Sequence, residues 1–112
     1  MQGVWLEDMS NKYGAIKSYS ELCGRGFDSI AERRRGEELH MLQLAGEITD
    51  LQYQVKFKLC DKPKITYTAD FQYIDRDGKV LTEDVKGVLT RDTRTKIAWV
   101  REKFDIEVIL VR

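Results

Sequence analysis

The sequence predicts one α/β domain with the element order α-β-β-β-α-β, in which a mixed sheet is flanked by helices. The chain has 112 residues, of which 42% are hydrophobic, enough for one core. Hydrophobic residues recur with a helical period before Gly46 and alternate with polar residues after it. After Gly87 a second helical pattern leads to a short apolar run. A crossover of this kind returns the last strand parallel to one of the first three.

The first helix is expected over residues 29–45. Ser29 is a good N-cap residue, and Glu32 follows it at the spacing of a capping box. Gly46 is a natural C-terminal stop. Upstream, residues 1–26 hold four of the eight glycines, so we expect an N-terminal arm there and the folded domain over 27–112.

The remaining elements follow from alternation, turns and one apolar stripe. Residues 51–59 alternate over nine positions, which is typical of a half-buried strand. A second strand is expected over 65–75 and a third over 79–86, joined by a turn that contains glycine. Residues 90–104 carry an apolar stripe at helical spacing, and 106–111 form the last strand.

Charge and composition exclude several classes of protein. Lys and Arg together number 19, as do Asp and Glu, so the chain is neither a uniformly basic nucleic-acid coat protein nor an acidic mimic of DNA. The longest aliphatic run, 108–111, is about a fifth of the ~20 residues that a membrane helix needs. No secretory signal is recognisable, so we expect a cytoplasmic protein and no membrane partner. Cys23 and Cys60 are then expected to be free thiols, and with His40 they are too few for a zinc site.

The hairpin of the second and third strands brings two aspartates into register. If residues 76–78 form a three-residue loop with Gly78 in the left-handed region, facing residues sum to 154. Asp70 then faces Asp84, with Cβ atoms about 5 Å apart. Lys86 shares that face, and Glu83 points away. A loop of two or four residues would shift the register by one, and Asp70 would no longer face Asp84. The alternative to a functional site is a solvated polar face of the sheet.

Two facing carboxylates repel each other unless a proton or a cation lies between them. Carboxylate oxygens are the ligands that Mg²⁺ or Mn²⁺ prefers. Lys86 beside them could orient a water molecule or stabilise negative charge on a phosphate. Phosphodiester hydrolysis needs this combination of a metal ion and a positive group.

These segments resemble the PD-(D/E)XK nuclease superfamily. The resemblance rests on Thr68-Ala69-Asp70-Phe71 and Glu83-Asp84-Val85-Lys86-Gly87, with Ser29-Ile30-Ala31-Glu32 as the preceding helix motif. The resemblance covers residues 26–111. In layout the chain is also similar to phage endonuclease I enzymes, which resolve four-way DNA junctions, and to related small phage proteins. Ala69 replaces the usual proline and Asp84 the usual glutamate, and neither change implies a loss of activity.

The resemblance implies a restriction-endonuclease-like core and a Mg²⁺ (or Mn²⁺) site. In it Asp70, Asp84 and the Val85 carbonyl hold the ion, and Glu32 completes the site directly or through water. Lys86 orients or activates the attacking water. The catalytic set is then Glu32, Asp70, Asp84 and Lys86.

Glu32 has a structural alternative as the capping-box partner of Ser29. At 100° per residue it nonetheless lies only about 20° from the line of Leu39, which is unusual for an acidic residue. Basic residues near the predicted site are candidates for phosphate contacts, although a solvated helix face is the alternative. They are Arg33, Arg34, Arg91, Arg94 and Lys96.

The sequence therefore predicts a Mg²⁺-dependent DNA endonuclease, structure-specific for branched DNA. Cutting both strands of a symmetric junction needs two sites, so a homodimer is expected. The alternative is a DNA-binding or protein-interaction module without turnover on the same fold. A nuclease for RNA or for DNA ends is a third hypothesis.

Overall fold

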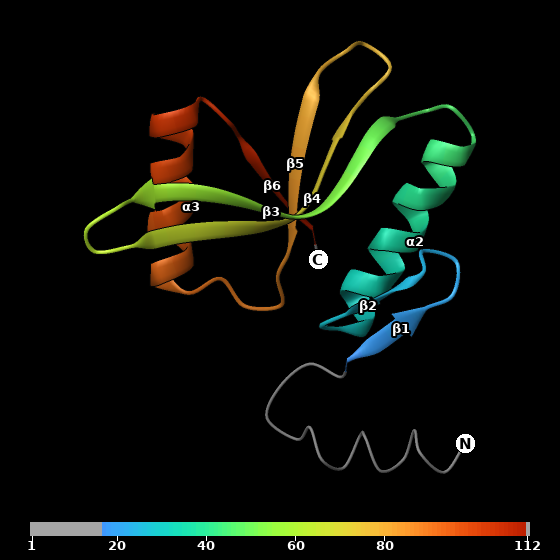
Figure 1. Ribbon diagram of the computed structural model, residues 1–112, viewed down its shortest axis with the longest axis horizontal. Coiled ribbons are helices and arrows are strands. Elements are labelled where there is room, and N and C mark those ends of the chain that lie inside the picture. Colours follow the sequence, from blue (N-terminus) through green and yellow to red (C-terminus); the bar gives the residue numbers. More distant parts are fainter. Residues whose placement is uncertain (1–16, 112) are drawn as a thin grey trace. The chain divides into compact units, whose positions relative to one another are not determined.

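The computed structural model describes residues 17–111, and the chain divides into two compact units, residues 1–40 and 41–112. In the N-terminal unit, β1 (Ser18–Ser20) and β2 (Arg25–Phe27) pair antiparallel as a small ribbon (Figure 1). Most of the N-terminal arm expected over 1–26 lies outside the described residues. The sequence does not predict this ribbon, because three-residue strands are too short to show alternation.

Helix α2 (Ile30–Leu44) begins and ends at the predicted signals. The Ser29 Oγ accepts a hydrogen bond from the Glu32 backbone N–H at 3.0 Å, which confirms the N-cap. At the other end Gly46 adopts φ 80°, and the Glu47 N–H donates to the Leu42 carbonyl at 2.9 Å. This left-handed glycine stop satisfies carbonyls that the end of a helix would otherwise leave unpaired.

The sheet of the C-terminal unit has the order β3-β4-β5-β6. Its strands are β3 (Thr49–Cys60), β4 (Ile65–Ile74), β5 (Val80–Val85) and β6 (Val108–Val111). The first three form an antiparallel meander, and β6 pairs parallel to β5. The mixed α/β sheet and the order α-β-β-β-α-β are thus confirmed.

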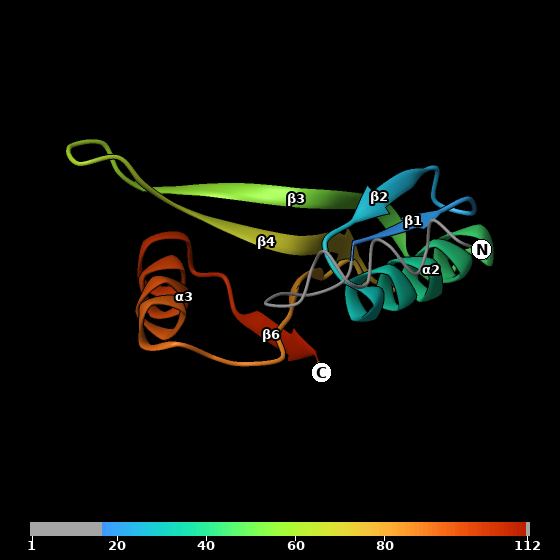
Figure 2. The ribbon, with the colours of Figure 1, turned by 90° about the horizontal axis from the view of Figure 1, so that it is seen from below.

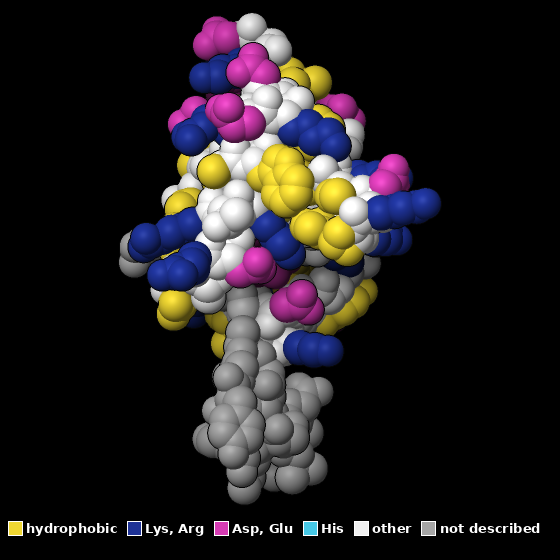
Figure 3. All heavy atoms as spheres, turned by 90° about the vertical axis from the view of Figure 1, so that its left-hand side faces the viewer, with side chains coloured by type: hydrophobic (Ala, Val, Ile, Leu, Met, Phe, Trp, Pro, Cys, Tyr) yellow, Lys and Arg dark blue, Asp and Glu magenta, His cyan; other side chains and the backbone are white. Residues whose placement is uncertain are grey.

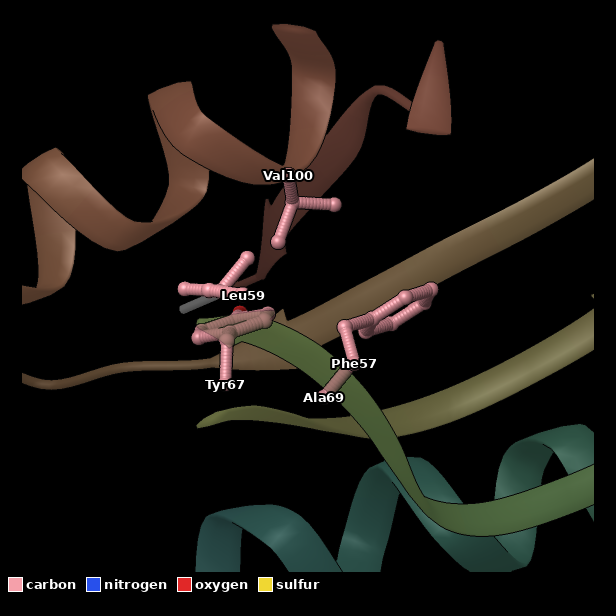
Figure 4. Close-up of a cluster of buried hydrophobic side chains, with 5 residues drawn as sticks. All are labelled: Phe57, Leu59, Tyr67, Ala69 and Val100. Atoms are coloured by element: carbon pink, nitrogen blue, oxygen red, sulfur yellow. The ribbon is translucent and has the colours of Figure 1, made fainter. Parts of the chain in front are cut away.

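Helix α3 (Arg91–Phe104) crosses from β5 to β6 and packs on one side of the β3–β4 ribbon (Figure 2). Buried apolar side chains from the ribbon and the helix meet between them in one cluster (Figure 4). The cluster contains Phe57, Leu59, Tyr67, Ala69 and Val100. Tyr67 and Ala69, the members of this cluster from β4, are near neighbours in sequence of the predicted site residue Asp70. Within the described residues no helix is long and apolar enough to span a bilayer.

The turn between β4 and β5 has the predicted three-residue geometry. Gly78 adopts φ 82°, and the Asp75 N–H donates to the Lys79 carbonyl at 2.9 Å. The paired residues run from Ile74–Val80 to Phe71–Glu83, and every pair sums to 154 as predicted. The ladder ends there, directly before Asp70 and Asp84.

Candidate functional site

Asp70 lies in the middle of β4, and its carboxylate contacts both neighbouring strands. Its Oδ2 accepts the Val85 backbone N–H of β5 at 2.8 Å, and its Oδ1 lies 3.4 Å from the Gln54 side-chain amide of β3. The Val85 N–H belongs to the peptide bond that follows Asp84. The Asp70 carboxylate therefore lies directly beside the backbone of Asp84.

Asp84 is fully buried, yet only one of its carboxylate oxygens is satisfied. Its Oδ2 accepts a hydrogen bond from the Tyr67 hydroxyl. Its Oδ1 is buried and has no hydrogen-bond partner among the described residues. Native proteins seldom leave such an oxygen without a donor, because its desolvation is costly. This oxygen suits a cation as its missing partner.

Lys86 supplies the positive charge that the sequence placed next to the acidic pair. Its Nζ lies 3.6 Å from Asp84 Oδ2, and its side chain is 35% exposed. Its backbone N–H donates to the Val111 carbonyl at 3.1 Å, so β6 fixes the end of β5. The ammonium group can thus reach both the carboxylate and a ligand arriving from solvent.

Tyr67 is a member of the site that sequence reasoning missed. Burial, the hydrogen bond to Asp84 and the charges of Asp84 and Asp70 together raise the pKa of its hydroxyl far above the usual value. The available signal was a tyrosine on the apolar line of β4, whose buried hydroxyl needs a hydrogen-bond partner.

Glu83, between Phe71 on β4 and Ile109 on β6, is held separately. It is 2% exposed and accepts a hydrogen bond from the Tyr73 hydroxyl. The site thus has two buried tyrosine–carboxylate pairs on successive residues of β5. Only the pair that contains Asp84 involves the predicted site residues.

The remaining predicted residues lie on the helices. Glu32 belongs to the N-terminal unit and is buried, and its role as a ligand stays a prediction. Arg33 forms an ion pair with Glu37 at 2.9 Å, and Lys96 forms one with Asp92 at 3.5 Å. Arg34, Arg91 and Arg94 are exposed. On the face in Figure 3, Lys and Arg side chains surround a hydrophobic patch and alternate with acidic ones.

Divalent ions such as Mg²⁺ are held in proteins chiefly by carboxylate and carbonyl oxygens. Within residues 17–111 no group of three or more His, Cys, Asp or Glu side chains is arranged to hold a metal. Mg²⁺, however, usually takes only one or two carboxylates and completes its shell with water and substrate phosphate. The two carboxylates of Asp70 and Asp84, the latter with an unsatisfied Oδ1, fit that type of site.

Comparison with known families matches residues 10–110 to the family described as "Protein of unknown function (DUF1064)". The chain belongs to the DUF1064 family. No curated protein and no solved structure matches it. The description of the DUF1064 family names no activity.

Proposed function

We propose that this DUF1064 protein is a Mg²⁺-dependent DNA endonuclease that hydrolyses phosphodiester bonds in branched DNA. One observation carries the proposal: the Asp70 carboxylate accepts the Val85 N–H directly beside the backbone of Asp84, and the Lys86 ammonium lies 3.6 Å from the Asp84 carboxylate. An acidic pair with a neighbouring lysine is the combination that metal-assisted phosphodiester hydrolysis requires.

The residues that would hold the ion are Asp70, Asp84 and the Val85 carbonyl, with Glu32 as the predicted addition from the helix. When bound, Mg²⁺ would polarise the phosphate and make a water molecule more acidic. Asp70 is kept in place by the Val85 N–H. Lys86 would orient the attacking water and stabilise negative charge on the phosphate.

Cleavage of a labelled four-way junction, a fork and a linear duplex tests the proposal. We expect cleavage with Mg²⁺, none with EDTA, and preference for the branched substrates. Asp70→Asn and Asp84→Asn should each lower the rate by about 100-fold or more, since each removes charge that the transition state uses. The exposed Glu102 offers a matched control, and Glu102→Gln should cleave at the wild-type rate.

Cleavage that survives both EDTA and Asp70→Asn would refute the metal mechanism. DNA binding without cleavage of any substrate would favour the module without turnover. Preference for RNA or for DNA ends would keep the chemistry and change the substrate.

A homodimer is part of the proposal, because a symmetric junction presents two strands to be cut and one chain carries one Asp70–Asp84 pair. Light scattering after size exclusion should give twice the 13.1 kDa mass of the chain, alone or on the junction. A single chain bound per junction, with both strands cut, would contradict the dimer.

A further inference from the structure

The β3–β4 ribbon packs one face against α3, and its other face carries exposed lysines. Phe57, Leu59, Tyr67 and Ala69 all belong to the buried cluster with Val100 of α3. The residues between them point to the other side of the ribbon, because side chains alternate along a strand. They are the facing pairs Lys56–Thr68 and Lys58–Thr66, which we call the lysine–threonine face. Both lysines are exposed and both threonines half-buried, and in Figure 2 α3 lies on the opposite side of the ribbon.

Positive charge is concentrated on this hairpin although the whole chain is neutral. Residues 55–69 contain four lysines and a single acidic residue, Asp61. Two of the lysines are on the lysine–threonine face, and Lys62 and Lys64 are exposed at the tip. Threonine hydroxyls beside lysines add hydrogen-bond donors for phosphate oxygens. The chemistry of this face complements a polyanion.

The lysine–threonine face runs directly into the candidate site. Gln54 lies between Tyr53 and Val55, which pair with Phe71 and Ala69, and its side-chain amide nitrogen lies 3.4 Å from Asp70 Oδ1. Lys56 and Lys58 follow Gln54 at about 7 and about 14 Å along the strand. That length corresponds to about two to four nucleotides of a strand, at about 3.4 Å each. Beyond the site, the same side of β3 and β4 continues with Gln52 and Gln72 and has no lysine.

We infer that the lysine–threonine face is a phosphate-binding track, which holds one DNA strand on one side of the site and leads it to Asp70. The inference rests on the proposed function for the end point of the track. It adds the direction of the bound DNA strand, which extends from the site toward the tip of the β3–β4 hairpin. Lys56 and Lys58 contact phosphates of the strand, and Thr66 and Thr68 lie beside them.

Asp61 modulates the track. Its carboxylate forms an ion pair with Lys58, and the two side chains are 74% and 59% exposed. An exposed pair of this kind contributes little to stability. A DNA phosphate can therefore replace Asp61 as the partner of Lys58.

Binding of a fluorescein-labelled four-way junction, measured in EDTA so that no cleavage occurs, tests the track. Lys56→Ala/Lys58→Ala should weaken binding about tenfold at ~0.1 M salt. The slope of log affinity against log salt should become shallower by about 1.4 to 1.8, which corresponds to two lost phosphate contacts. Lys56→Arg/Lys58→Arg keeps the charge and should bind like wild type. Asp61→Asn should strengthen binding about twofold.

The matched control is Arg76→Ala/Lys79→Ala, which removes two exposed charges at the opposite turn of the sheet. It should stay within twofold of wild type. Equal weakening by both alanine pairs, unchanged binding by Lys56→Ala/Lys58→Ala, or no junction binding by the wild type would each overturn the track. If Lys56→Ala/Lys58→Ala binds the junction like wild type and the wild-type protein cleaves it, the track is refuted and the proposed function stands. If the Lys56→Ala/Lys58→Ala substitutions weaken junction binding but the wild-type protein cleaves no substrate, the proposed function is refuted and the track stands.

Discussion

Asp84 is the most unusual carboxylate of the site, because it is buried and only partly hydrogen-bonded. It is 0% exposed, one oxygen is held by Tyr67, and the other has no donor among the described residues. Proteins rarely bury a charged oxygen in this way without a partner. The neighbouring Asp70 adds a second negative charge, which makes a cation the simplest partner. If an ion binds as proposed, the residues around Asp84 are expected to set its affinity.

Tyr67 is a positioning residue for this carboxylate, and Tyr67→Phe isolates its hydroxyl. We expect Mn²⁺ affinity, measured by calorimetry, to fall about 10- to 100-fold, as for other residues that orient metal ligands. Stability should fall by about 1 to 3 kcal/mol, because the buried acceptor loses its donor.

Tyr73→Phe is the matched control, since Tyr73 makes the same contact with buried Glu83. It should cost similar stability and leave Mn²⁺ affinity unchanged. An equal loss of Mn²⁺ affinity in the two variants would contradict a specific role for Tyr67.

Glu37 makes the stability of the N-terminal unit depend on pH. The hydrogen bond from the Ser20 hydroxyl, with a contribution from the Arg33 charge, lowers the pKa of Glu37 against an opposing effect of burial. The folded state then binds this proton less readily than the unfolded chain. The resulting stabilisation is complete above the unfolded value of about 4.3 and is lost as the pH falls through the folded value.

We expect the unfolding free energies of wild type and Glu37→Gln to converge as the pH falls from 5 toward 3. Urea unfolding across that range measures the difference. In the Ser20→Ala background the same substitution should show much less pH dependence. A difference that stays constant from pH 7 to 3 would argue against this linkage.

At the scale of elements, α3 has a conventional start and a strained end. Thr90 caps its N-terminus, accepting the Thr93 N–H at 3.2 Å. Asp105 ends the helix with φ 57°, and its N–H donates to the Arg101 carbonyl at 2.9 Å. This left-handed conformation costs free energy for a residue with a Cβ atom, whereas glycine adopts it without that cost.

Asp105→Gly should therefore stabilise the protein by about 0.5 to 1 kcal/mol, measured by thermal or urea unfolding. Thr90→Ala should destabilise it by about 1 kcal/mol at the other end of the same helix. Lower stability of Asp105→Gly would show that the aspartate side chain contributes more than its backbone strain costs.

At the scale of the whole molecule, folding brings acidic groups together and a cation should stabilise the result. Mn²⁺ at about 100 times its dissociation constant should raise the free energy of unfolding by about 2.7 kcal/mol. Differential scanning fluorimetry with Mn²⁺ and with EDTA measures the shift. Asp84→Asn should lose it and Glu102→Gln should keep it. A shift of equal size in Asp84→Asn would place the ion elsewhere.

Much of the fold was predictable because its signals are local. Alternation predicts β3, a run rich in Thr, Tyr and Phe between two turns predicts β4, and Ser29 and Gly46 mark the ends of α2. The glycine turn sets the β4–β5 register. The short β1–β2 ribbon escaped prediction, since three residues cannot display a period. The arrangement of Glu32 with the aspartates stays a prediction.

By itself, the sequence determined the larger elements, the β4–β5 register as far as the Phe71–Glu83 pair, and the spacing of Asp84 and Lys86, because periodicity and turn chemistry act between near neighbours. Only the tertiary structure decided how the carboxylates are held. The end of the ladder after Phe71–Glu83, the contact of Tyr67 with Asp84 and the lysine–threonine face of the ribbon depend on packing against β6 and α3. Such packing joins residues distant in the chain, and no local pattern encodes it.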